Sequence, residues 1–266
     1  NFANKVWNIG RFVINAINRI EKRQENEVKL TLADSWIWAK TRQTVNNVNN
    51  LFENYQFGEA GKQVYEFLWN DFADWYLEAS KRQLNEGGDR ADNTAKILAE
   101  VLDLMLRLLH PFTPFVTEAM WGHLKNACQS NDKVYTPENG WEEHLMVAKW
   151  PERMENESWE DAAIKDFELV QELVRSIRNL RSEFKVEPNK KVDAILVSAA
   201  RVDFLKENKN LLVDLAGLNE DNLTIHAEKP DTEGLTVLVV EDVEVYLNLA
   251  AGAESELDRE RLEKEL

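Results

Sequence analysis

The chain has 266 residues, 44% of them hydrophobic and 30% charged, a composition that excludes collagen-like and low-complexity chains and favours about two folded domains. No apolar run reaches the roughly 18 residues that cross a bilayer, no signal peptide is recognisable, and the single Cys128 excludes an intramolecular disulfide, so we expect a cytoplasmic protein without a membrane partner. The net charge of −16 counts against a nucleic-acid partner for the chain as a whole, but the first 50 residues hold 8 basic and only 4 acidic side chains.

Apolar spacing predicts that the amino-terminal half is helical. The first predicted helix carries a stripe of apolar residues at alternating spacings of three and four, which places them on one face: Phe2, Val6, Ile9, Val13, Ile17 and Ile20. A second helix begins after Thr31, where Asp34 completes a capping box, and its Asn-rich middle must be held by packing because Asn favours helices weakly. An aromatic third helix runs from about Gly58 to Leu84, and Gly87 ends it.

The fourth helix is predicted to be the buried centre of a bundle. Apolar residues occur almost all round it between Asp92 and Pro111, which is typical of a helix enclosed on every side. Thr113 followed by Pro114 is typical of a helix start and predicts a short fifth helix to about Ala127.

Beyond this helical part the pattern changes. Residues 130–150 have turn composition and predict a loop with an extended end at 145–150, and a helix is predicted over 167–184. The remaining elements are typical of a small α+β module, with strands at 192–197, 223–226, 235–240 and 243–249 and a helix at 202–216.

These elements predict a mainly α fold in four parts. The parts are a helix bundle at 1–128, a linker or loop at 129–160, a small α+β module at 161–250 and the start of a truncated coiled-coil arm at 251–266. The first helix is already in phase at Asn1, which is not Met, and the last helical repeat is cut at Leu266. We therefore expect this chain to be a piece of a longer protein.

No residue pattern predicts a catalytic or metal site. The four histidines lie far apart in different elements, no glycine-rich phosphate loop is present, and Cys128 has no neighbouring base in the sequence. Asp and Glu total 48, so close carboxylate pairs are unavoidable and carry no information. We expect no catalytic residue, no metal and no bound cofactor in these 266 residues.

The informative surface is the polar face of the first helix. Amides and cations repeat there beside the apolar stripe, at Asn1, Asn4, Asn8, Arg11, Asn15 and Asn18, and a second set follows every seven residues at Lys5, Phe12 and Arg19. Amides can read base edges, guanidinium groups can pair with phosphate or guanine, and an aromatic ring can stack on an unpaired base, as in the recognition of single-stranded loops. The alternatives are a solvated polar face or amides bonded to a neighbouring helix, and Phe12 could equally belong to the core.

A second basic stripe lies on the helix predicted at 167–184 and just after it. Its members are Arg175, Arg178, Arg181 and Lys185, and they fall within about a third of the helix circumference. They could follow the phosphates of a nucleic acid, or they could pair with Glu172, Glu183 and Glu187 in this acidic part of the chain. The second interpretation is favoured because acidic residues surround the stripe.

Several motifs together resemble the carboxyl-terminal part of bacterial valyl-tRNA synthetases. They are NFANKVWNIGRFV at 1–13, TLADSWI at 31–37, VYEFLWNDFADWYLEASK at 64–81, LRLLHPFTPFVTEAMW at 106–121, RSIRNLRSEFKVEP at 175–188 and LDRERLEKEL at 257–266. The resemblance covers essentially the whole chain in order.

The resemblance implies a helix-bundle anticodon-binding domain, followed by a small module and a coiled-coil arm. It implies valine tRNA as the partner, together with the missing catalytic and editing domains of the same chain, and a monomer. In that family another domain uses ATP to activate valine and carries HIGH and KMSKS motifs. Neither motif occurs here. We therefore expect this piece to bind tRNA but to be inactive as a ligase.

Residue by residue, the resemblance implies two groups of anticodon contacts. The first group is Asn4, Lys5, Asn8, Arg11 and Phe12, and the second is the WYLE segment, Trp75 to Glu78. Trp75 is expected in the core, so Leu77, Glu78 and the following Lys81 are the residues of the second group that could reach an anticodon base. The candidate phosphate contacts are Arg19, Arg175, Arg178, Arg181 and Lys185. The alternative function is a protein-interaction scaffold that does not bind RNA, and an autonomous enzyme is disfavoured because no catalytic group is arranged by spacing.

Overall fold

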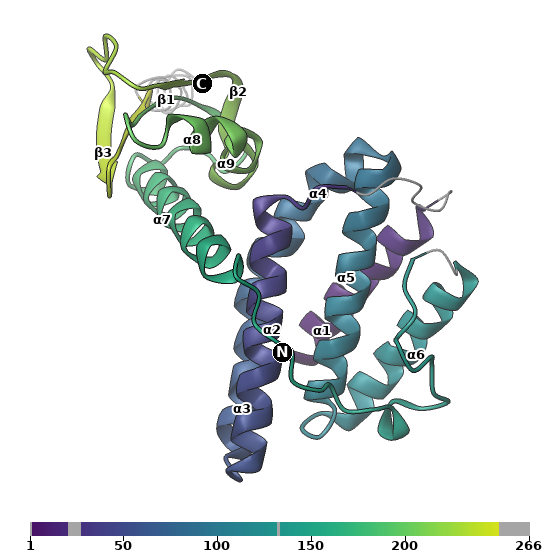
Figure 1. Ribbon diagram of the computed structural model, residues 1–266. Coiled ribbons are helices and arrows are strands. Elements are labelled where there is room, and N and C mark those ends of the chain that lie inside the picture. Colours follow the sequence, from purple (N-terminus) through teal and green to yellow (C-terminus); the bar gives the residue numbers. More distant parts are fainter. Residues whose placement is uncertain (1, 21–27, 132–133, 250–266) are drawn as a thin grey trace, which may run out of the picture. The chain divides into compact units, whose positions relative to one another are not determined.

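The computed structural model describes residues 2–20, 28–131 and 134–249 (Figure 1). The chain forms two compact units, residues 1–164 (unit 1) and residues 165–266 (unit 2), and they divide within helix α7 (Glu160–Glu183). The α+β module was predicted to begin at 161, slightly earlier in the chain. The coiled-coil arm that we predicted at 251–266 lies outside the described residues.

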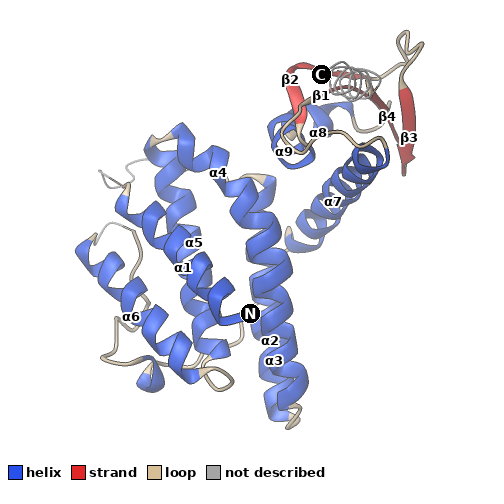
Figure 2. Ribbon diagram, turned by 180° about the vertical axis from the view of Figure 1, so that it is seen from behind, coloured by secondary structure: helices blue, strands red, loops and turns tan. Residues whose placement is uncertain are grey.

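Unit 1 is helical. Its elements are α1 (Phe2–Asn18), α2 (Leu32–Glu53), α3 (Phe57–Glu66), the π-helical segment η1 (Phe67–Tyr76), α4 (Leu77–Glu86), α5 (Gly88–Leu109), α6 (Pro114–Ser130) and the short 3₁₀ segment η2 (Leu145–Val147). All described strands lie in unit 2 (Figure 2). No helix among the described residues is long and apolar enough to cross a membrane. The predicted mainly α fold is confirmed.

The helix boundaries differ from the predicted ones in two places. The predicted aromatic helix is one continuous helical stretch from Phe57 to Glu86, but its middle, η1, has π-helical bonding. Helix α5 begins at Gly88, four residues before the predicted start, because Gly87 and Gly88 both adopt positive φ and turn the chain within two residues.

Helix α5 is the buried centre of unit 1, as predicted. It contacts α1, α2, α3, α4 and α6, and Leu98, Leu102 and Leu106 are fully buried along it. The apolar stripe of α1 faces this core. Gly10 brings α1 close to α6, since a Cβ atom at this position would lie 1.9 Å from the sulfur of Met120. The position of α1 is therefore set by close packing.

A buried polar network joins α2 to the helical stretch 57–86. The Asp34 carboxylate is fully buried and completes the predicted capping box with Thr31. It also accepts hydrogen bonds from the Tyr76 hydroxyl at 2.9 Å and the Gln83 amide at 3.2 Å, and the Arg90 guanidinium lies 3.6 Å away. Burial, followed by the nearby Asp34 charge, raises the pKa of Tyr76 well above its usual value.

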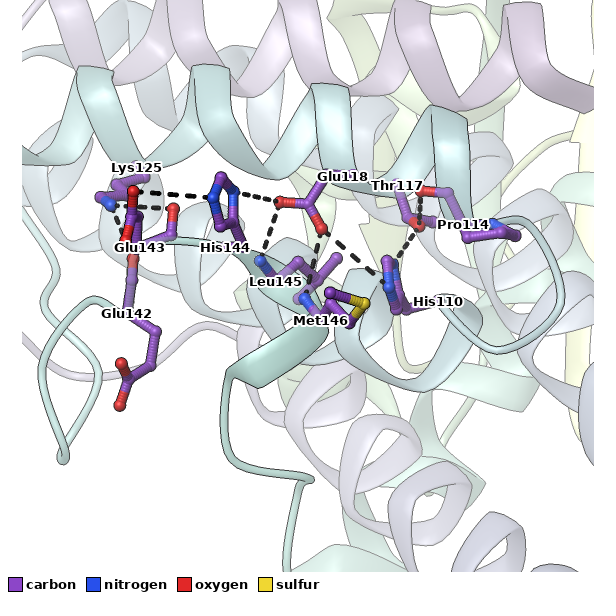
Figure 3. A network of polar contacts seen from close by, with 10 residues as sticks. All are labelled: His110, Pro114, Thr117, Glu118, Lys125, Glu142, Glu143, His144, Leu145 and Met146. Atoms are coloured by element: carbon purple, nitrogen blue, oxygen red, sulfur yellow. Dashed lines mark hydrogen bonds and ion pairs between the residues drawn. The ribbon is translucent and has the colours of Figure 1, made fainter.

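Residues 142–147 are held on α6 by the Glu118 carboxylate and by the Lys125 ammonium, which donates to the carbonyls of Glu142 and Glu143 (Figure 3). Glu118 accepts hydrogen bonds from the backbone N–H groups of Leu145 and Met146, at 2.9 and 3.2 Å. The imidazole of His144 lies 3.6 Å from one carboxylate oxygen, and that of His110 lies 4.0 Å from the other. The extended conformation that we predicted at 145–150 is therefore wrong for Leu145–Val147, which form a 3₁₀ turn around this anchor.

The segment after η2 lies against α2. The Asn46 amide bonds to both the carbonyl and the N–H group of Met154, and Asn49 bonds to the Pro151 carbonyl and to the Trp150 indole. These bonds explain why α2 tolerates its Asn-rich middle. The Asn46 and Asn49 side chains bind the segment 150–154. Part of the predicted linker is therefore fixed to the bundle.

Unit 2 is a small α+β module, as predicted. Its sheet has the order β2 (Leu218–His226), β1 (Val192–Val197), β4 (Val243–Leu247) and β3 (Thr236–Val240), with β1 parallel to β2 and antiparallel to β4. Between β1 and β2 the predicted single helix is divided at Asn208 into α8 (Val202–Glu207) and α9 (Lys209–Ala216), and both contact β2. Strand β2 begins at Leu218, five residues before the predicted start.

We expect Asp34→Ala to destabilise unit 1 by about 3 kcal/mol, because the change leaves several buried donors without an acceptor. Urea unfolding followed by far-UV circular dichroism measures this loss. The control is Ser35→Ala at the next position of α2, which should stay within about 0.5 kcal/mol of the wild type. Equal stability of the two variants would contradict the structural role of the network.

The buried thiol predicts alkaline destabilisation. Burial, with a smaller contribution from the Asp103 charge, raises the pKa of Cys128 from 9.0 to about 12. The stabilisation is fully present below pH 9 and is lost as the pH rises toward 12, because the unfolded chain ionises first. We expect the free energy of unfolding to fall more steeply above pH 9 in the wild type than in Cys128→Ala. Parallel pH profiles would contradict this.

Candidate nucleic-acid interface

Helix α1 lies beside the continuous helical stretch formed by η1 and α4. Phe2 contacts Tyr65 with ring centroids 4.9 Å apart, and Lys5 pairs with Asp74 farther along both segments. Because one face of α1 is buried in the core, its polar face is left beside η1 and α4. The two segments form the walls of a groove.

The groove has a volume of about 450 Å³ and an open mouth. Its lining residues are Asn4, Lys5, Asn8, Ile9 and Phe12 from α1 and Ala73, Asp74, Leu77, Glu78 and Lys81 from η1 and α4. Ile9 and Leu77 are almost completely buried, whereas Glu78 and Lys81 are exposed. The groove therefore combines an apolar floor with amides and charges at its rim.

The structure brings seven of the eight predicted anticodon residues together in this groove. Arg11 is the exception, because it is exposed but does not line the groove. Phe12 is partly exposed, so its ring is not enclosed in the core. The side-chain amides of Asn4 and Asn8 form no hydrogen bond with a residue in the ranges 2–20, 28–131 and 134–249, so they do not bind a neighbouring helix there.

The charges at the rim form two pairs. The Lys5 ammonium lies 2.7 Å from the Asp74 carboxylate, and the Lys81 ammonium lies 2.6 Å from Glu78. The Arg11 guanidinium, by contrast, forms no hydrogen bond or ion pair with another described residue. Two paired ammonium groups therefore lie at the rim of the groove, and a guanidinium without a partner among the described residues lies outside it.

Sequence spacing did not identify every residue of the groove. Asp74 and Ala73 come from η1, whose π-helical bonding widens each turn and changes which side chains share a face. A helix with 3.6 residues per turn does not predict that alignment. Trp69, also in η1, contacts Lys5 through its ring, and the aromatic composition alone could not assign this contact.

Two members of the second basic stripe, Arg178 and Arg181, have a structural role in unit 2. The Arg181 side chain is 8% exposed and donates to the carbonyls of Ala216, Gly217 and Lys190. Arg178 donates to the Leu215 carbonyl at 2.8 Å. These guanidinium groups bind carbonyls at the carboxyl end of α9, where the helix dipole favours cations.

The predicted phosphate contact of Arg181 therefore does not fit the structure, and carbonyl oxygens rather than the predicted glutamates bind its side chain. Burial, followed by the charge of Arg178, lowers the pKa of Arg181. Arg175, Lys185 and Arg19 are exposed. Arg19 follows the end of α1, so it lies beyond the groove in the chain.

No cluster of three or more His, Cys, Asp or Glu residues that could hold a metal ion occurs in the described part of the chain.

Comparison with known proteins identifies the family. The family model described as the anticodon-binding domain of tRNA ligase matches residues 34–196. The chain belongs to this family. The match begins after α1, so the α1 wall of the groove lies outside it, whereas the wall formed by η1 and α4 lies inside.

Individual relatives extend the similarity to the whole chain. A valine–tRNA ligase of Petrotoga mobilis is 35% identical over 266 residues, which cover 100% of this chain and 29% of the relative. A valine–tRNA ligase of Bacillus cereus is 36% identical over 269 residues, covering 99% and 28%, and that of Thermotoga maritima is 34% identical over 263 residues, also covering 99% and 28%. The chain thus spans less than a third of the length of these relatives, and the resemblance stated from its motifs is confirmed.

The structural role of Arg181 can be tested by following the stability of unit 2. We expect Arg181→Ala to destabilise unit 2 by about 2–4 kcal/mol, because three carbonyls lose a charged donor. Hydrogen exchange at the β1 amides measures the loss. Lys191→Ala is the control, since Lys191 is exposed nearby, and should change the protection little. Unchanged protection in Arg181→Ala would contradict this assignment.

Proposed function

We propose that the chain is the tRNA-binding part of a valine–tRNA ligase and that the groove takes unpaired nucleotides of the anticodon loop. The observation that supports this most directly is the gathering of Asn4, Asn8 and Phe12 with Leu77, Glu78 and Lys81 around one groove. These residues come from two segments more than sixty positions apart in the sequence. The family of the chain supports the same function.

The groove offers a distinct chemistry for each part of a nucleotide. The Phe12 ring is the stacking surface for a base. The Asn4 and Asn8 amides can donate to and accept from base edges, and the Glu78 carboxylate can accept from the amino group of cytosine or adenine. Arg11, just outside the groove, is placed for the RNA backbone or for a neighbouring base.

The complete enzyme would attach valine to its tRNA in the cytoplasm as a monomer. ATP and valine would be bound by catalytic and editing domains that these 266 residues do not contain, so this piece would be inactive as a ligase. Binding by the piece itself should be weak, because the other domains add contacts to the same tRNA. The net charge of −16 weakens it further and confines the attraction to local cationic groups.

The test is binding of an RNA hairpin that carries the valine anticodon loop. We expect Phe12→Ala to weaken binding by about 1–3 kcal/mol, the usual contribution of one stacked base, and Arg11→Ala combined with it to weaken binding further. Phe115→Ala is the control, because Phe115 is also an aromatic residue of unit 1 and is 91% exposed, but it does not line the groove. It should bind RNA like the wild type.

Two further measurements separate RNA binding from a protein-interaction scaffold. Affinity should fall as the salt concentration rises, because phosphate contacts release counterions. A hairpin with an altered anticodon should bind less tightly than the valine hairpin. Equal affinity for both hairpins and for Phe12→Ala would contradict the proposed site.

A further inference from the structure

The two lysines that line the groove are held in different ways. Lys81 pairs with Glu78 one turn earlier in its own helix, and the two side chains are 52% and 47% exposed, so both ends of this pair can move into solvent. Lys5 is only 21% exposed, and its ammonium group lies 3.9 Å from the centroid of the Trp69 ring. Of these two cations, Lys5 is therefore the one with a fixed position.

A row of aromatic rings supports this position. Trp69 stacks on Tyr65 with centroids 5.6 Å apart and planes 17° apart, and Tyr65 in turn contacts Phe2. The row joins α3 and η1 to the start of α1, so Trp69 cannot rotate without losing the ring contact with Tyr65. A cation over the face of a tryptophan is attracted by the ring quadrupole, and this attraction leaves the charge of the cation intact.

The anion that pairs with Lys5 is the more exposed partner. Asp74 is 54% exposed, and its carboxylate lies 2.7 Å from the Lys5 ammonium at the rim of the groove. An exposed ion pair contributes little to stability, because water solvates both groups well. Asp74 can thus turn into solvent at small cost, whereas Lys5 stays on the Trp69 ring.

We propose that Lys5 binds a phosphate of the RNA in the groove, that Trp69 is the residue that positions it, and that Asp74 occupies the place of this phosphate in the free chain. This inference rests on the proposed RNA-binding function. The exchange replaces one oxygen anion by another at the same ammonium group. Asp74 then acts as a competitor of RNA rather than as a reader of bases.

The inference predicts an unusual direction for one substitution. Asp74→Asn should increase the affinity for the valine anticodon hairpin by about twofold to fivefold, the range that corresponds to the loss of one exposed ion pair. The matched control is Glu66→Gln, which removes the same charge from an exposed position that does not line the groove. The gain in Asp74→Asn should exceed the gain in Glu66→Gln. Weaker binding by Asp74→Asn, or equal gains, would overturn the proposal.

The role of Trp69 is tested by a double-mutant cycle. Trp69→Leu should weaken binding and reduce the slope of affinity against salt by about one counterion, as Lys5→Met does, because the phosphate contact is lost in both. In the Lys5→Met background Trp69→Leu should have no further effect. Trp69→Phe, which keeps a ring, should restore most of the affinity. Additive losses would overturn the positioning role.

One measurement tests the position of Lys5 on the Trp69 ring without RNA. The ε-methylene protons of Lys5 should show an upfield ring-current shift in the NMR spectrum of the free chain, and Trp69→Leu should abolish it. If the hairpin binds and Phe12→Ala weakens the binding, but Asp74→Asn does not tighten it, the proposed exchange of Asp74 for a phosphate is wrong and the proposed function stands. If the hairpin does not bind the wild type, both are wrong, whatever the NMR spectrum shows.

Discussion

The close packing of one face of α1 is the constraint on which the groove depends. Gly10 lies against Met120, and Val13 and Ile17 are fully buried, so α1 can neither rotate nor move away from the bundle. Because side chains three and four residues apart share a helix face, burying one stripe fixes where the adjacent polar stripe points. The position of Asn8 and Phe12 beside α4 follows from the core and needs no separate interaction.

The opposite wall is held by a different kind of contact. The Asp34 carboxylate binds Tyr76 and Gln83, which lie on either side of Leu77 and Glu78 in the chain. A buried carboxylate with several donors is costly to move, because any donor that loses it stays desolvated. One wall of the groove is thus placed by apolar packing and the other by a buried polar network, and both lie on rigid helices, as a binding site requires.

Much of this arrangement could be predicted from the sequence, but not all of it. The stripe of α1 and the capping box at Thr31 are local patterns with a fixed period or spacing, and both are confirmed. The contacts of Lys5 with Trp69 and Asp74 join residues more than sixty positions apart, and the π-helical bonding of η1 shifts their alignment. No helical period encodes such a contact, so only the structure could identify Trp69 and Asp74 as the neighbours of Lys5.

The two groups of arginines show why a charge pattern alone does not define a phosphate site. Arg11 and Arg181 both lie on regular basic or polar stripes of a helix. Arg11 is exposed, whereas Arg181 donates to carbonyls at the end of α9 and just before β1. The difference comes from what faces each helix. The carboxyl end of α9 supplies carbonyl oxygens without partners in the helix, and these accept hydrogen bonds from a guanidinium. In an acidic chain such internal acceptors reduce the number of cations on the surface. The exposed cations beside the groove are therefore more important for any attraction of RNA.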